Sequence, residues 1–242
     1  MELPWATITI ATLMLASYLF TYQNINYYKC ILGFKPSSPS IYSPFTYMFV
    51  HKNLFHLIGN LGMFILLGYI VEEAVGKKGL VTVFFFSGFV SLLFDVLGRI
   101  LLGIRMNVPF IGASCGIFGL LAVASLIRPT RKIPTFLLFV SFLPLLQLFV
   151  TLPIFLDFMV QITVLSLTVI LVIILLIVLP KYTPLFISSS IFIVSWAIFL
   201  ILMIPTSVSN VGHLGGFVGG ILFILLSGRK KRIYSEPSNI YS

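Results

Sequence analysis

The sequence has few charged residues, and this scarcity indicates the class of protein. Only 9% of its 242 residues are charged and six are acidic, whereas 59% are hydrophobic. A soluble domain carries roughly a quarter charged residues, so this chain cannot cover a water-facing surface. We therefore expect it to fold within lipid, and its length leaves no room for a separate soluble domain.

Cysteine is equally scarce. Cys30 and Cys115 have neither the spacing of a disulfide framework nor that of a metal site, so we expect no disulfide and no metal ion. The first apolar run has no basic residue before it and no small-residue cleavage site. It is therefore expected to be a retained span and not a removed signal peptide.

Long apolar runs make up most of the chain. They are too long and too uniform for barrel strands, which need alternation, so we expect every run to be helical. At roughly 20 residues per span, the sequence predicts an all-α, polytopic membrane helix bundle of about eight spans. The expected spans are residues 5–20, 54–71, 80–101, 112–127, 134–152, 155–179, 185–204 and 211–227.

The net charge of +9 lies mainly at the ends of these runs, so we interpret it as a topological signal and not as a nucleic-acid-binding surface. With both termini inside, most of the basic residues face the cytoplasm, provided that three spans lie between residues 127 and 211. The sequence therefore predicts a multi-pass protein of the cell membrane. Residues 229–242 form a short cytoplasmic tail, basic and then polar.

Polar side chains at membrane depth are costly and need a reason. His56 and Asn60 share one helical face near the start of the second span, where they either bond to a neighbouring helix or act chemically. Ser114 begins the fourth span among small residues, which often serve packing alone. A helix start also exposes backbone N–H groups without intrahelical partners, and these are the donors that an oxyanion needs.

The third cluster begins the last span. His213, Gly216 and Gly220 lie on one helical face, which is smooth enough for very close helix contact. Under the predicted topology, His56, Ser114 and His213 all lie near the outer start of their spans and therefore at one depth. A neutral histidine beside a serine hydroxyl is a minimal base and nucleophile, and three unrelated packing roles would have to coincide there. We therefore interpret the clusters as a serine-hydrolase site.

These clusters resemble the motifs of the rhomboid intramembrane serine proteases. The resemblance covers about residues 40–130 and 205–228 and rests on the order of short motifs on alternate spans. The motifs are His51-x4-His56-x3-Asn60, Gly112-Ala113-Ser114 with Phe118, Glu72-x3-Gly76, and His213-x2-Gly216-x3-Gly220.

The resemblance implies a Ser–His dyad without a carboxylate, with Ser114 as nucleophile and His213 as general base. It implies an oxyanion hole formed by His56, Asn60 and the Ser114 backbone N–H, and an aromatic ring, Phe118, against the dyad histidine. The implied substrates are transmembrane segments of other membrane proteins, and no cofactor or metal is implied. Residues 1–228 would form the rhomboid-like domain, a six-helix core with two extra helices within about 134–204.

Some residues depart from the family pattern. Cys115 follows the nucleophile where the family usually has glycine, and the loop before the second span lacks the family's Trp-Arg pair. A catalytically inactive relative that binds or moves membrane helices is therefore the alternative. A small transporter ranks last, since buried acidic residues on facing helices and a repeat are lacking.

Two further groups of charges are given structural roles. Asp95 and Arg99, four residues apart in the third span, are expected to form an intrahelical ion pair. Glu72 and Glu73, beside Lys77 and Lys78, are expected to form solvated pairs at the inner surface. By family analogy, Glu72 is also a candidate for tying the second helix to the third.

Overall fold

The computed structural model describes residues 3–103, 105–134, 181–201 and 209–228. The described part is mainly helical, as the sequence predicts. The chain divides into two compact units, residues 1–127 with 211–242 and residues 128–210. The residues singled out as candidate site residues all belong to the first unit.

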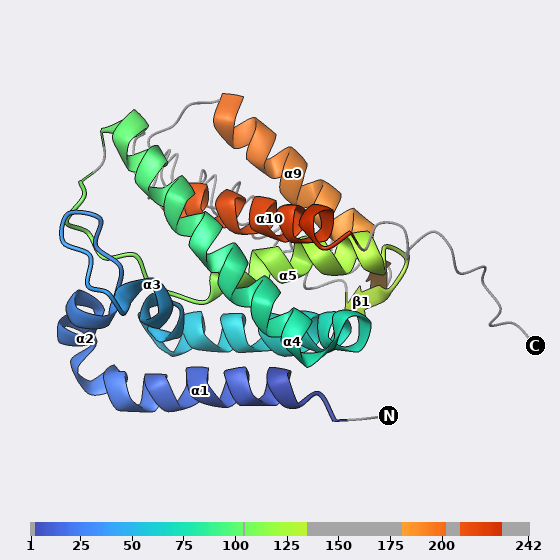
Figure 1. The fold of residues 1–242 in the computed structure, drawn as a ribbon, viewed down its shortest axis with the longest axis horizontal. Helices are drawn as coiled ribbons and strands as arrows, with labels where there is room; N and C mark the ends of the chain where they lie inside the picture. Colours follow the sequence, from blue (N-terminus) through green and yellow to red (C-terminus); the bar gives the residue numbers. More distant parts are fainter. Residues whose placement is uncertain (1–2, 104, 135–180, 202–208, 229–242) are drawn as a thin grey trace, which may run out of the picture. The chain divides into compact units, whose positions relative to one another are not determined.

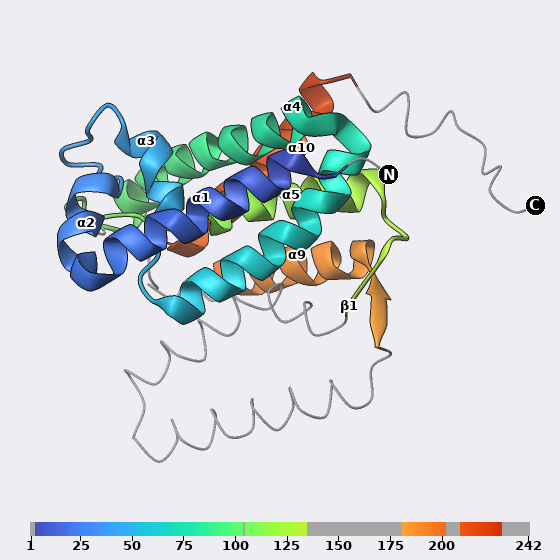
Figure 2. The same ribbon diagram turned by 90° about the horizontal axis from the view of Figure 1, so that it is seen from below.

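The first unit begins with α1 (Trp5–Thr21), which packs against α4. The sequence predicts no helix in the segment between α1 and α4, but the structure has short helices there. These are η1 (Tyr22–Asn24), α2 (Ile25–Leu32), α3 (Ser43–Thr46) and η2 (Tyr47–Phe49). Figures 1 and 2 show α2 and α3 side by side beyond the C-terminal end of α1.

Helix α4 (Leu54–Leu102) consists of two arms, because Gly76 interrupts it with φ 77° and ψ 170°. This positive φ is readily available only to glycine, and Figure 1 shows α4 folding back on itself. The arms, residues 54–75 and 77–102, correspond to the second and third predicted spans. Phe64 and Phe84 join them edge to face, with ring centroids 5.1 Å apart.

Helix α5 (Ser114–Ile127) is the central helix of the first unit. Every residue from Cys115 to Ser125 is buried, as expected for a helix that is apolar all round. Its neighbours are the α4 arms and α10 (Ser209–Leu226).

Helix α10 packs by bringing its backbone against two neighbours at once. A Cβ on Gly216 would collide with the backbone carbonyl of Cys115, and one on Gly220 with that of Gly119, both in α5. A Cβ on Gly219 would lie 2.7 Å from the Cα of Ser87, in the second arm of α4. Glycine at these positions therefore sets the separation of the helices, as the smooth face of α10 predicted.

By length and composition, two helical stretches of the described part are able to cross a membrane, Trp5–Leu32 and Leu54–Leu101. Each α4 arm spans at least roughly 33 Å, enough for a hydrocarbon core of about 30 Å. The other apolar helices found are shorter, Ser114–Ile127, Leu185–Ser195 and Val211–Leu226. The predicted spans 134–152 and 155–179 lie almost wholly outside the described residues, so the count of eight spans stays a prediction.

The second unit contains a small sheet that the sequence did not predict. Strand β1 (Lys132–Pro134) pairs antiparallel with β2 (Tyr182–Pro184), and Ile133 lies opposite Thr183. Helix α9 (Leu185–Ile201) follows β2 directly and corresponds to the predicted span 185–204. Strands of three residues carry too little alternation to be recognised in a sequence.

Glu72 has a different role from the predicted solvated pair. Its carboxylate accepts hydrogen bonds from the backbone N–H groups of Ala6 (3.0 Å) and Thr7 (2.8 Å) and from the Thr7 hydroxyl (2.7 Å). The prediction was wrong because the side chain turns inward and caps the N-terminus of α1, where N–H groups lack intrahelical partners. Glu72 therefore ties the first arm of α4 to α1.

Replacing Glu72 by alanine is expected to lower the free energy of unfolding by about 2–3 kcal/mol, because three donors at the start of α1, two of them on buried Thr7, lose a charged acceptor. Equilibrium unfolding in detergent micelles measures this. Glu73→Ala is the matched control, since Glu73 is its exposed neighbour, and it should change stability little. Equal losses in the two variants would contradict the capping role.

Candidate active site

The structure brings Ser114 and His213 into direct contact. Ser114 is the first residue of α5 and His213 the fifth of α10. The Ser114 Oγ lies 2.7 Å from the His213 Nε2, a hydrogen bond between residues 99 positions apart in the chain. Both side chains are half-buried, so the contact is sheltered but still reachable.

The direction of this hydrogen bond follows from the chemistry of imidazole. The hydroxyl donates to Nε2 when the imidazole is neutral and carries its hydrogen on Nδ1. The Nδ1 atom is buried, and among the described residues it has no hydrogen-bond partner. In the described part of the chain, the pair therefore has no carboxylate on its far side, unlike a Ser-His-Asp triad.

Phe118 and the α10 glycines hold the imidazole in place. The Phe118 ring, one turn after Ser114, lies with its centroid 4.9 Å from that of His213. Because Gly216 follows His213 by three residues and touches the α5 backbone, the imidazole lies close to the start of α5. The structure thus brings these predicted supporting residues together around the Ser–His contact.

His56 reaches the same place from the start of α4. A Cβ built on Gly112 would lie 3.0 Å from the His56 Nε2 and 3.9 Å from the Ser114 Oγ. The position of this absent Cβ is therefore close to both His56 and Ser114. No side-chain atom occupies it, because residue 112 is glycine. Gly112 also has φ 112°, which other residues rarely adopt.

The His56 ring is oriented by its other nitrogen. The Lys52 backbone N–H donates to His56 Nδ1 at 3.4 Å, so in the neutral ring Nε2 carries the hydrogen. That Nε2–H lies beside the point described above, where it is able to donate to a negative oxygen.

His51 packs behind His56. The two imidazole centroids are 5.1 Å apart with an interplanar angle of 63°, and His51 Nδ1 lies 3.2 Å from the Phe49 carbonyl oxygen. Burial lowers the pKa of His51 to about 4, because it disfavours the charged form. His51 is therefore neutral above that pH, and its contacts with His56 and the Phe49 carbonyl are structural.

Asn60 is buried, but its position is less direct than the prediction implies. Its Nδ2 donates to the backbone carbonyl of His56 at 2.7 Å, within its own helix. Within the described ranges, no hydrogen bond joins Asn60 to Ser114. The bond to the His56 carbonyl uses one of the two Nδ2 hydrogens of Asn60. The other hydrogen remains to donate to a bound oxyanion.

The chain before Ser114 is held by a contact that the sequence analysis missed. The Gly112 N–H donates to the Tyr47 carbonyl oxygen at 2.8 Å, while the Tyr47 hydroxyl donates to the Gly88 carbonyl at 3.0 Å. Tyr47 thus links the second arm of α4 to the residues that precede Ser114. The contact with Gly112 is made by the backbone carbonyl of Tyr47. Because every residue type has this carbonyl, the contact cannot be recognised from the amino-acid sequence.

The residues that the structure describes contain no group of three or more histidine, cysteine, aspartate or glutamate side chains able to hold a metal ion. The described residues at the Ser–His contact supply a hydroxyl, two imidazoles, an amide and backbone N–H groups. Such a set is able to attack a carbonyl carbon and to stabilise the oxygen that becomes negative.

Comparison with known proteins gives a match to a protein family. The family model of the rhomboid domain matches residues 38–230. This range includes α3, both arms of α4, α5 and α10. The search of curated proteins and that of solved structures each returned no match.

Proposed function

The chain belongs to the rhomboid family of integral membrane proteins, and from this premise we propose that it is a serine endopeptidase that cleaves transmembrane segments of other membrane proteins. The observation that carries the proposal is the 2.7 Å contact between Ser114 and His213. A hydroxyl and an imidazole in this arrangement form a nucleophile and its general base. Their half-burial suits a substrate that arrives from lipid and a water molecule that arrives from the surface.

The proposed reaction has two steps. Ser114 Oγ attacks the carbonyl carbon of the scissile peptide bond while His213 Nε2 takes the hydroxyl proton. His213 then gives this proton to the nitrogen of the leaving chain, and the acyl group stays on Ser114. A water molecule, deprotonated by His213, attacks the acyl carbon and releases the second product, and the serine regains its proton.

The developing negative oxygen needs donors at the point beside Gly112. His56 Nε2–H is the strongest candidate, because its other nitrogen is held by the Lys52 N–H. The Ser114 backbone N–H lies at the start of a helix, where it has no intrahelical partner. Asn60 contributes through the amide hydrogen that does not bond to the His56 carbonyl. These donors stabilise the tetrahedral intermediate more than the substrate.

Cys115 does not compete with Ser114 in this proposal. Its side chain is fully buried, whereas that of Ser114 is half-exposed. The Cys115 backbone also lies against Gly216, so the residue serves the packing of α10 on α5. The nucleophile is therefore the hydroxyl.

In the proposed orientation, both termini lie in the cytoplasm and the site lies near the outer face of the cell membrane. His56 lies at one end of the first arm of α4, while Lys77 and Lys78 follow the turn at the other end. Basic residues favour the cytoplasmic side. Water therefore reaches His56, Ser114 and His213 from outside.

A fluorophosphonate probe tests the proposal, because it reacts with activated serines. The purified wild-type protein in lipid vesicles should be labelled at Ser114, located by mass spectrometry, and Ser114→Ala should abolish the labelling. Ser125→Ala, in the same helix and outside the site, should keep it. Labelling that persists in Ser114→Ala would contradict the role of Ser114, and a folded wild type that is not labelled would favour a non-catalytic relative that binds membrane helices.

A further inference from the structure

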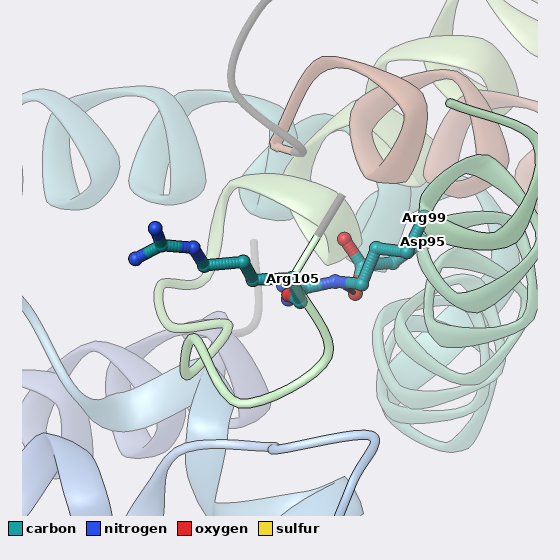
Figure 3. Close-up of polar contacts among 3 residues, drawn as sticks. All are labelled: Asp95, Arg99 and Arg105. Atoms are coloured by element: carbon teal, nitrogen blue, oxygen red, sulfur yellow. Dashed lines mark hydrogen bonds and ion pairs between the residues drawn. The ribbon is translucent and has the colours of Figure 1, made fainter. Parts of the chain in front are cut away.

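A buried ion pair lies in the second arm of α4. Arg99 Nε donates to Asp95 Oδ2 at 2.8 Å, and the two side chains are 1% and 0% exposed. The sequence predicted this pair as a local feature of one helix. Figure 3 shows that the pair is directed toward the chain segment that follows α4.

Arg99 makes a second contact that leaves its own helix. Its Nη1 donates to the backbone carbonyl of Arg105 at 2.7 Å. In Figure 3 the Arg105 side chain extends away from the pair, and it is exposed. The contact therefore depends on the backbone at position 105 and not on the identity of its side chain.

Position 105 begins the connection that leads to the nucleophile. Downstream of it, the Met106 carbonyl accepts from the Ser37 N–H at 3.1 Å. Phe110 and Phe34 exchange two backbone hydrogen bonds of 2.8 and 3.0 Å. The Gly112 N–H then bonds to the Tyr47 carbonyl, two residues before Ser114. The connection 105–113 is thus held from both ends, and Arg99 holds its start.

The chemistry of the pair suits this task better than it suits packing alone. Buried charges are costly, and an apolar pair of similar volume often gives a fold at least as much stability. The planar guanidinium, however, presents several donors in a fixed geometry, so it is able to bond to a carboxylate and a carbonyl together. Asp95 orients Arg99, and Arg99 fixes the carbonyl.

We infer that Asp95 and Arg99 are positioning residues that fix the 105–113 connection and so set where Gly112 and Ser114 lie relative to His56 and His213. This inference rests on the proposed function, since it concerns the same serine. The pair touches none of the reacting atoms and acts through the backbone between position 105 and α5.

Arg99→Gln tests this inference with a small change. The glutamine Nε2 is the same number of bonds from the backbone as the arginine Nε, so it keeps a hydrogen-bond donor for Asp95. It lacks the atoms that reach the Arg105 carbonyl. The rate of fluorophosphonate labelling per folded molecule should fall roughly 10- to 100-fold, as for a misplaced nucleophile. Arg105→Ala keeps the carbonyl and should label as the wild type does.

The two native cysteines give a second readout that needs no catalysis. Cys115 is buried beside Ser114, and Cys30 is exposed. If the connection is released, alkylation of Cys115 by N-ethylmaleimide should rise about tenfold or more in Arg99→Gln. Cys30 should react equally in every variant and serves as the internal reference.

The outcomes separate this inference from the proposed function. Slow labelling together with faster Cys115 alkylation supports a positioning role. If folded Arg99→Gln shows wild-type values in both assays, the positioning role is wrong and the proposed function is unaffected. If the wild type itself is not labelled, the proposed function is wrong, and the alkylation assay still shows whether Arg99 fixes the connection. If Arg99→Gln does not fold, the apolar double variant Asp95→Leu/Arg99→Met decides in the same two assays.

Discussion

His213→Ala is expected to lower the rate at which the protein cleaves a transmembrane substrate by about 10³-fold or more. The imidazole bonds directly to the Ser114 hydroxyl, and without it the serine has no base to take its proton. The measurement is the initial rate of cleavage in lipid vesicles, with the folded fraction of each variant determined separately. A folded variant that keeps a tenth of the wild-type rate would contradict the role of His213.

The double variant Ser114→Ala/His213→Ala is the control for this prediction. Residues that act as one unit are strongly non-additive in their effects on rate. The double variant should therefore be no slower than Ser114→Ala alone. Two losses that multiply would indicate that the residues act separately.

Gly216→Val is expected to have the largest effect on the fold, lowering the free energy of unfolding by about 3 kcal/mol or more. A Cβ at this position would collide with the Cys115 carbonyl oxygen and lie 2.8 Å from its carbonyl carbon. Because both are backbone atoms of a buried helix, α10 has to move away from α5. The move carries His213 with it, so cleavage should be lost in any molecules that still fold.

Gly62→Val is the matched control for this packing effect. Gly62 also lies in a helix, the first arm of α4, but a Cβ there meets no atom within 4 Å. Its substitution should leave stability and activity close to wild type. Thermal unfolding in detergent, followed by activity in vesicles, compares the two variants. If both substitutions have equal effects, the close contact of Gly216 with α5 does not explain the effect of Gly216→Val.

The meeting of His56, Ser114 and His213 was predictable because it depends on simple rules. Three helices that start on one side of a membrane place their first residues at one depth, since every residue adds the same rise. Charge bias predicts which side that is. Equal depth therefore selects His56, Ser114 and His213 whichever helices are neighbours, and the structure brings these three residues together.

The contacts of Glu72, Tyr47 and Arg99 were not predictable in the same way. Each depends on which backbone group lies opposite in the folded chain, and backbone groups are the same in every residue. Nearby lysines in the sequence suggested partners for Glu72, but the start of α1 supplies three donors together. Local spacing found the Asp95 partner of Arg99 and missed its contact with the Arg105 carbonyl.

Apolar runs predicted the α4 arms but not where they end. The predicted spans stopped at residue 71 and resumed at residue 80, where charged residues begin and end. In the structure the helix continues through these polar residues and breaks only at Gly76. Lipid solvation sets the apolar span, whereas backbone geometry sets the turn. The extra helices predicted within 134–204 remain predictions, since most of that range lies outside the described residues.

The most direct test of the account is cleavage of a single-span membrane protein by the purified chain in lipid vesicles that contain no other protein. The substrate carries a different tag at each end, and wild type is compared with Ser114→Ala at equal folded concentration. The wild type should release two fragments, each retaining one tag, and Ser114→Ala should release none. An intact substrate with both proteins, or the same fragments from both, would contradict the account.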